Sequence, residues 1–61
     1  MKPRQQKIMK LLAQGFTQKE VAAKMNTTPT SINNRLKYLR VKHGKRTVIE
    51  LVVDYALKEI I

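Results

Sequence analysis

The side chains best suited to specific chemistry lie in one stretch near the middle of the sequence. Asn33, Asn34 and Lys37 recur at helical spacing with Thr30, and residues 21–49 contain no carboxylate. An Asn amide can pair bidentately with adenine in the major groove of DNA, and a Lys ammonium can donate to N7 and O6 of guanine. A solvated helix face usually mixes charges of both signs, so this acid-free pattern favours contact with a polyanion.

Enzymatic chemistry finds little support in the composition. The 61 residues include no cysteine, one histidine and four carboxylates, and the two glycines are each explained as helix ends. No nucleophile with its base, carboxylate pair or glycine-rich phosphate loop can therefore be assembled. His43 is expected to be a partly buried structural residue. We predict no catalytic residue, no metal site and no cofactor, and we do not expect an enzyme.

Charge is distributed unevenly along the chain. The net charge is +9, and residues 1–46 hold twelve Lys and Arg against Glu20 alone, whereas residues 47–61 are net acidic. Such a basic segment suits a polyanionic partner. A chain of this length forms one domain with a small core. The absence of cysteine is as expected of a reducing compartment, and no signal peptide or stretch of 18 apolar residues is visible.

Two adjoining helices are expected to position the polar residues. The pattern predicts a short helix over residues 17–25 and a longer one over residues 29–43. Asn26 tolerates the left-handed conformation that ends a helix, and Thr28 followed by Pro29 is an N-cap with a first-turn proline. A turn of only three residues makes the two helices cross steeply. This arrangement is the helix-turn-helix unit.

The longer helix has two opposed faces. One face is directed at the core: Ile32, Leu36, Leu39 and His43. The opposite face carries the polar set together with Val41. Side chains that would meet phosphates lie on the flanks: Arg35, Tyr38, Arg40 and Lys42. The second of the two helices is therefore interpreted as a recognition helix.

Two further helices complete the expected all-α, four-helix fold. A scaffold helix over residues 4–14 ends at Gly15, and a last helix spans residues 47–61. The apolar arc of the last helix covers about 200°, roughly twice what packing on one small core requires. One half is assigned to the core: Val48, Leu51, Val52 and Tyr55. The other half is assigned to a homodimer contact: Ile49, Val53, Ala56 and Ile60.

Residues 3–52 resemble the LuxR/GerE-type helix-turn-helix domain over nearly the whole chain. The strongest pieces are KIMKLLAQGFTQKEVAAKM and HGKRTVIELV, and the spacing is kept without a gap. The resemblance implies a four-helix DNA-binding domain whose third helix enters the major groove and whose fourth helix commonly mediates dimerisation. It also implies a stand-alone GerE-like transcription regulator or an excised domain, because most members carry a second, signal-receiving domain.

The resemblance assigns roles to particular residues. Those matching base-reading positions are Asn33, Asn34 and Lys37, to which the helical face adds Thr30. Those matching backbone-contacting positions of the family include Thr17, Thr28, Thr30, Ser31, Lys45 and Arg46. Beyond the resemblance, Lys19 and the flanking Arg35, Tyr38 and Arg40 are also expected to contact the DNA backbone. The chain departs from the family pattern at Asn26, where glycine is usual, and at Asn33, Arg35 and His43, where lysine, histidine and leucine are common. The target DNA sequence therefore cannot be transferred.

Double-stranded DNA is the expected partner, and RNA polymerase is a further candidate partner. The expected location is the cytoplasm, in association with the nucleoid. Two alternatives stay open. The chain could be a small antagonist that heterodimerises with a larger LuxR-type regulator through its last helix. It could also be a basic membrane-active peptide, although its most apolar helix is acidic, the reverse of what anionic lipid attracts.

Overall fold

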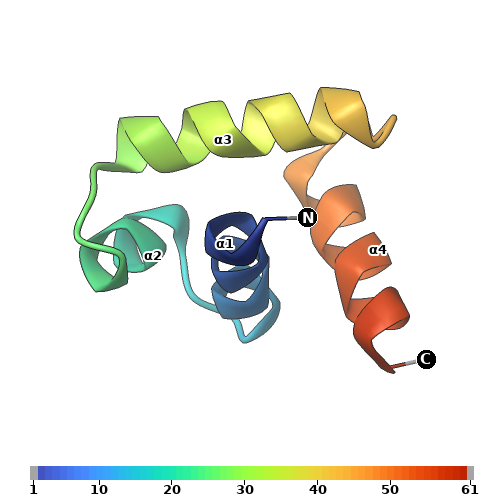
Figure 1. Cartoon of the computed structure of the whole chain (residues 1–61), viewed down its shortest axis with the longest axis horizontal. Helices are drawn as coiled ribbons and strands as arrows, with labels where there is room; N and C mark the ends of the chain where they lie inside the picture. The colour runs from blue at the N-terminus through green and yellow to red at the C-terminus, as the bar shows by residue number, and fades with distance from the viewer. Residues whose placement is uncertain (1, 61) are drawn as a thin grey trace.

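The computed structural model describes the backbone of residues 2–60 and the side chains of residues 2–58. Four helices and no strands make up this part of the chain, which confirms the all-α class (Figure 1). They are α1 (Pro3–Ala13), α2 (Gln18–Lys24), α3 (Pro29–Lys42) and α4 (Val48–Ile60). The end predicted for the last helix, residue 61, lies outside the described residues.

Side-chain caps begin three of the helices. Before α2, the Thr17 hydroxyl accepts the Glu20 backbone N–H at 3.1 Å, and the Glu20 carboxylate accepts the Thr17 N–H at 2.9 Å. This reciprocal pair is a capping box. Before α4, Thr47 caps the Glu50 N–H, but the Glu50 carboxylate accepts from Arg46 instead of Thr47. The start of α4 therefore has the Thr47 cap, while the Glu50 side chain bonds one residue further out, at Arg46.

The first three helices end in the same way. In α2 the Asn26 N–H bonds to the Ala23 carbonyl and the Thr27 N–H bonds to the Ala22 carbonyl, the pair of bonds that defines a Schellman motif. Asn26 holds a positive φ of 56°. Gly15 and Gly44 take the same place after α1 and α3. Every connection in the domain is thus short and fixed by backbone hydrogen bonds.

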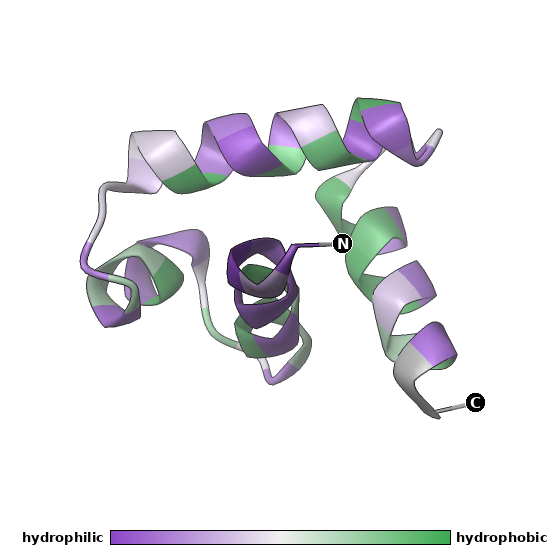
Figure 2. Cartoon of the chain, viewed as in Figure 1, coloured by the Kyte–Doolittle hydropathy of each residue, from purple (hydrophilic) through white to green (hydrophobic). Residues whose placement is uncertain are grey.

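One apolar cluster lies where the four helices meet. α1 packs against α2 and α4, and α3 packs against α2 and α4. The buried members come from all four helices: Ile8, Met9, Val21, Ala22, Ile32, Leu36, Leu39 and Leu51. Figure 2 shows the hydrophobic side of α3 turned towards α1 and α2 and its hydrophilic side turned away from them. The core thereby fixes which face of α3 is presented outward.

His43 is exposed, so the prediction that it is partly buried is wrong. It is the C-cap of α3, with a φ of −98° and a ψ of 6°, and the chain turns away at Gly44 directly after it. The helical spacing of His43 points towards the core, but α3 has already passed the edge of the small core at that residue. Met9 of α1 is fully buried within the cluster.

Candidate nucleic-acid interface

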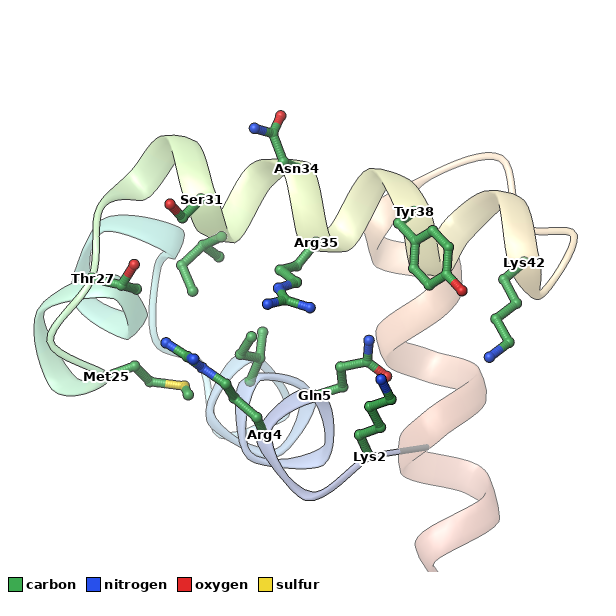
Figure 3. Close-up of a pocket in the computed structure, with 12 residues that line it drawn as sticks. Lys2, Arg4, Gln5, Met25, Thr27, Ser31, Asn34, Arg35, Tyr38 and Lys42 are labelled. Carbon is green, nitrogen blue, oxygen red and sulfur yellow. The ribbon is translucent and has the colours of Figure 1, made fainter.

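The four residues predicted to read bases share the outer face of α3. Thr30, Asn33, Asn34 and Lys37 are all exposed, and the Asn34 side chain points away from the other helices (Figure 3). The opposite face of α3 is buried in the core and holds the helix in this orientation. Its buried residues are Ile32, Leu36 and Leu39. We call these four residues the recognition face. Its amide, hydroxyl and ammonium groups match the donors and acceptors of base edges in the major groove.

Val41 continues the recognition face towards the end of α3. The sequence placed it on this face, but no contact with DNA was predicted for it. It is 79% exposed, the highest value among the large hydrophobic residues of the described chain. An apolar side chain on such a face can contact the C5-methyl group of thymine. Its position on the polar side of the helical wheel was the available signal. Lys42, next to it, lies with its Nζ 5.8 Å from the centre of the Tyr38 ring.

Hydroxyl groups cap the starts of α2 and α3, and one of them keeps a proton for a phosphate. The Thr17 hydroxyl accepts the Glu20 backbone N–H, and its own proton is directed to the Glu20 carboxylate. The Thr28 hydroxyl accepts from the Ser31 N–H at 3.2 Å and donates to the Ser31 hydroxyl at 3.0 Å. The Ser31 hydroxyl can then donate onward. Lys19, in the first turn of α2, is exposed beside them.

The Glu20 carboxylate is tied to this capping arrangement. Its pKa is held below the usual value, chiefly because it accepts the Thr17 backbone N–H and hydroxyl, with a smaller contribution from Lys24. It is the sole carboxylate of residues 1–46. The hydrogen bonds direct its charge to the start of α2, where a negative charge also suits the helix dipole. The recognition face is therefore left free of acid.

Two cations assigned to DNA phosphates are engaged within the molecule. The Arg40 guanidinium is half-buried, with one terminal nitrogen donating to the Arg46 carbonyl and its Nε buried without a partner in the described part of the chain. The Lys45 ammonium lies 3.5 Å from an Asp54 carboxylate oxygen. Both side chains thus brace the connection between α3 and α4. Arg46 itself is exposed.

Asp54 is the acceptor that draws Lys45 inward. Its other oxygen lies 3.1 Å from Lys58 Nζ, one turn further along α4. The pKa of Asp54 is lowered mainly by the hydrogen bond from Lys58, and further by the charge of Lys45. Sequence spacing alone pairs Asp54 with Lys58 at i and i+4. The pair with Lys45 depends on how α4 folds back on α3, so the sequence could not predict it.

The outward side of α4 carries an unpaired apolar stripe. Ile49 is 75% exposed, Val53 is 50% exposed and Leu57 is 55% exposed. We call these three residues the α4 patch. Ala56 lies half-buried at its edge, and the Ile60 side chain falls outside the described residues. Leu57 was not predicted to belong here. The core half is as predicted, with Leu51 buried and the other three packed partly against the cluster.

A short helix, a capped turn and a longer helix with an exposed polar face define this molecule as a helix-turn-helix domain. Residues 2–53 match the family model described as bacterial regulatory proteins, luxR family. The chain therefore belongs to the luxR family, which consists of DNA-binding transcription regulators and not of enzymes. Comparison with curated proteins and with solved structures gives no significant match.

The described residues contain neither a metal-binding group nor a membrane-spanning helix. Within the described residues, no group of three or more His, Cys, Asp or Glu side chains is placed to hold a metal ion. The same part of the chain holds no helix with the length and apolar character that a bilayer crossing requires.

Proposed function

We propose that the protein is a sequence-specific regulator that places α3 in the major groove of double-stranded DNA. The observation that carries this proposal is the recognition face, which is exposed, free of acid and held outward by the core. In helix-turn-helix domains the second helix of the unit reads base edges while the first crosses the backbone. Asn33 and Asn34 would pair with adenine, Lys37 would donate to guanine, and Thr30 would serve either.

Backbone contacts would surround this helix on both sides. Thr17, Lys19, Thr28 and Ser31 would contact one strand from the starts of α2 and α3. Arg35, Tyr38 and Arg46 are exposed and would contact phosphates along the flank and beyond the end of α3. Phosphate contacts of this kind fix register without carrying sequence information. Arg40 and Lys45 would contribute mainly by holding the connection that presents Arg46.

We also propose that two copies associate through the α4 patch. A second copy is the occupant that the molecule favours, because a two-fold axis sets the same three apolar side chains against themselves. A patch at i, i+4 and i+8 runs along one side of the helix and is unlike the scattered exposed hydrophobic residues of an ordinary surface. The patch lies on the opposite side of α4 from the core, so dimerisation would leave the recognition face open.

Selection of bound fragments from a random pool of double-stranded DNA tests the proposal directly. We expect enrichment of a defined sequence arranged as two inverted half-sites, because a dimer with two-fold symmetry reads a palindrome. Recovery of the pool without enrichment would contradict sequence-specific recognition. An antagonist that acts by heterodimerisation would instead bind DNA of any sequence weakly, and the exposed recognition face favours the regulator over that alternative.

A further inference from the structure

An open groove lies between the start of α1 and one flank of α3. It encloses about 690 Å³, and its residues surround the space drawn in Figure 3. Buried Ile8 and Ile32 form its apolar floor. Its rim is cationic, and no carboxylate lines it: the cations are Lys2, Arg4, Arg35 and Lys42. Four positive charges around one concave surface favour an anion, because the fields add inside the concavity.

Gln5 lies inside this groove with an amide that no other described side chain or backbone group engages. It is 6% exposed and is the one buried polar residue of the described chain, yet its amide makes no hydrogen bond to any described residue. Figure 3 shows the side chain extending from α1 into the space below α3. The amide atoms themselves remain accessible from the groove, since Arg40 Nε is the one buried polar side-chain atom without a partner among the described residues. The Gln5 side chain therefore offers Nε2 as a donor to a ligand in the groove.

The first turn of α1 supplies further donors at the same place. Lys2 is the N-cap and provides no side-chain acceptor, and the first turn contains no acid. The Gln6 N–H bonds to the Lys2 carbonyl, but the N–H groups of Arg4 and Gln5 precede the first partners in the helix. Proline at the first position has no N–H of its own. The positive end of the α1 dipole thus lies at the same end of the helix as Lys2, Arg4 and Gln5, which line the groove.

We propose that this groove binds a phosphate group. Gln5 Nε2 would donate to a phosphate oxygen, the first-turn N–H groups of α1 would add backbone donors, and Arg4 and Arg35 would neutralise the charge. The groove is much larger than one phosphate and falls in the size range of small-molecule sites. The phosphate is therefore part of a larger molecule, either the DNA backbone beside α3 or a phosphorylated small molecule. Reading of bases by the recognition face is not needed for this site.

A titration of the folded chain with inorganic phosphate, followed by heteronuclear NMR at constant ionic strength, tests the proposal. We expect the side-chain amide signal of Gln5 to move saturably, together with the backbone amide of Arg4. In Gln5→Glu a carboxylate of the same shape occupies the groove, and phosphate binding measured at Arg4 should weaken about tenfold or more, as for loss of a hydrogen bond to a charged group. Thermal unfolding of this variant establishes that it is folded.

Arg4→Gln and Lys7→Gln form a matched pair for the same titration. Both remove one exposed cation from α1, but only Arg4 lines the groove. Arg4→Gln should weaken phosphate binding roughly two- to fivefold, the range of an exposed ion pair, while Lys7→Gln should leave it unchanged. Equal weakening in both variants, or no saturable movement of the Gln5 signal, would overturn the proposal. That result would leave recognition of DNA by α3 untouched.

A short DNA duplex added to the same sample identifies the source of the phosphate. If the duplex moves the Gln5 amide signal and free phosphate competes with it, the groove holds the DNA backbone. If free phosphate moves this signal and the duplex does not, the groove takes a phosphorylated small molecule. Either result supports the site. A Gln5 signal that responds to neither ligand rejects it.

Discussion

At the scale of single residues, α3 separates groups that distinguish bases from groups that only neutralise phosphates. Lys37→Ala, Asn33→Ala or Asn34→Ala should each cost about 1–3 kcal/mol of binding free energy at the selected site and relax preference at one base pair. These residues are exposed, so truncation should not affect folding. Binding of a panel of single-base variants by each mutant protein provides the measurement.

Arg46→Ala is the control for that series. Its side chain is exposed beyond the end of α3, where it can reach phosphates but not base edges. It should weaken binding to every DNA sequence by a similar factor. If the Asn and Lys substitutions also weakened all sequences equally, the recognition face would be assigned to the wrong side of α3.

Apart from His43 at the C-cap, the sequence was sufficient to place residues on the two faces of α3, because a helical period of 3.6 residues follows from local geometry. The sequence could not predict the internal contacts of Arg40 and Lys45. Both are residue types that bind phosphate, but Arg40 donates to the Arg46 carbonyl and Lys45 pairs with Asp54. Gln5 illustrates the same limit. Its polar type predicts a solvated position, whereas in the folded chain it is buried beside the groove between α1 and α3. Contacts between elements decided each of these cases.

At the scale of the element, the turn between α2 and α3 depends on one residue in the left-handed region. Asn26 adopts a φ of 56°, which costs glycine nothing and costs most other residues about 1–2 kcal/mol. Asn26→Gly should raise the free energy of unfolding by a few tenths to about 1 kcal/mol, and Asn26→Ala should lower it by about 1 kcal/mol. Chemical denaturation of the three proteins measures both changes.

Replacement of an Asn by Gly within a helix should instead lower the free energy of unfolding. Asn33→Gly changes an exposed residue within α3, where glycine is a poorer helix former, and it should lower stability by a few tenths of a kcal/mol. Equal stability of Asn26→Gly and Asn26→Ala would mean that the turn relaxes into another conformation.

The start of α2 should be sensitive to acid. The pKa of Glu20 is lowered in the folded state by the hydrogen bonds with Thr17, so its contribution is fully present above the unfolded carboxyl pKa, which is about 4.3. The contribution is lost as the pH falls through the lower, folded value. Melting temperatures between neutral and acidic pH should therefore converge for the wild-type protein and Glu20→Gln. A difference that stays constant down to the acidic limit would show that the capping box is not responsible.

At the scale of the whole molecule, the net charge of +9 should make DNA binding strongly dependent on salt. Each phosphate neutralised adds about −0.9 to the slope of log affinity against log salt concentration. With Arg40 and Lys45 engaged internally, four exposed cations remain near the phosphates, namely Lys19, Arg35, Lys42 and Arg46. We expect a slope of roughly −3 to −4 per protomer. Fluorescence anisotropy at several salt concentrations measures it, and an affinity that does not vary with salt would contradict this mode of binding.

The α4 patch is the surface through which we propose that two copies of the chain associate. A domain of 61 residues has too little interior to bury both halves of the apolar arc of α4, and Leu51 with its neighbours already fills the inner half. Burying an aliphatic side chain is worth about 1.5–3 kcal/mol, and a two-fold interface buries each patch residue twice. Val53 lies between Ile49 and Leu57 at the centre of the patch, so it is the position where a charge should act most strongly.

Val53→Asp should give a folded monomer, because Val53 is half exposed and a carboxylate there would face its own copy across the two-fold axis. The monomer should bind a single half-site weakly and lose the paired site, and its melting temperature should fall because association also stabilises the fold. Val41→Asp makes the same change on the exposed end of α3, and it should impair DNA binding while leaving the dimer intact. Analytical ultracentrifugation of the three proteins at tens of micromolar, with and without DNA, measures the assembly. A wild-type chain that sediments as a monomer under both conditions would exclude the α4 dimer, and a Val53→Asp protein that unfolds would place Val53 in the core.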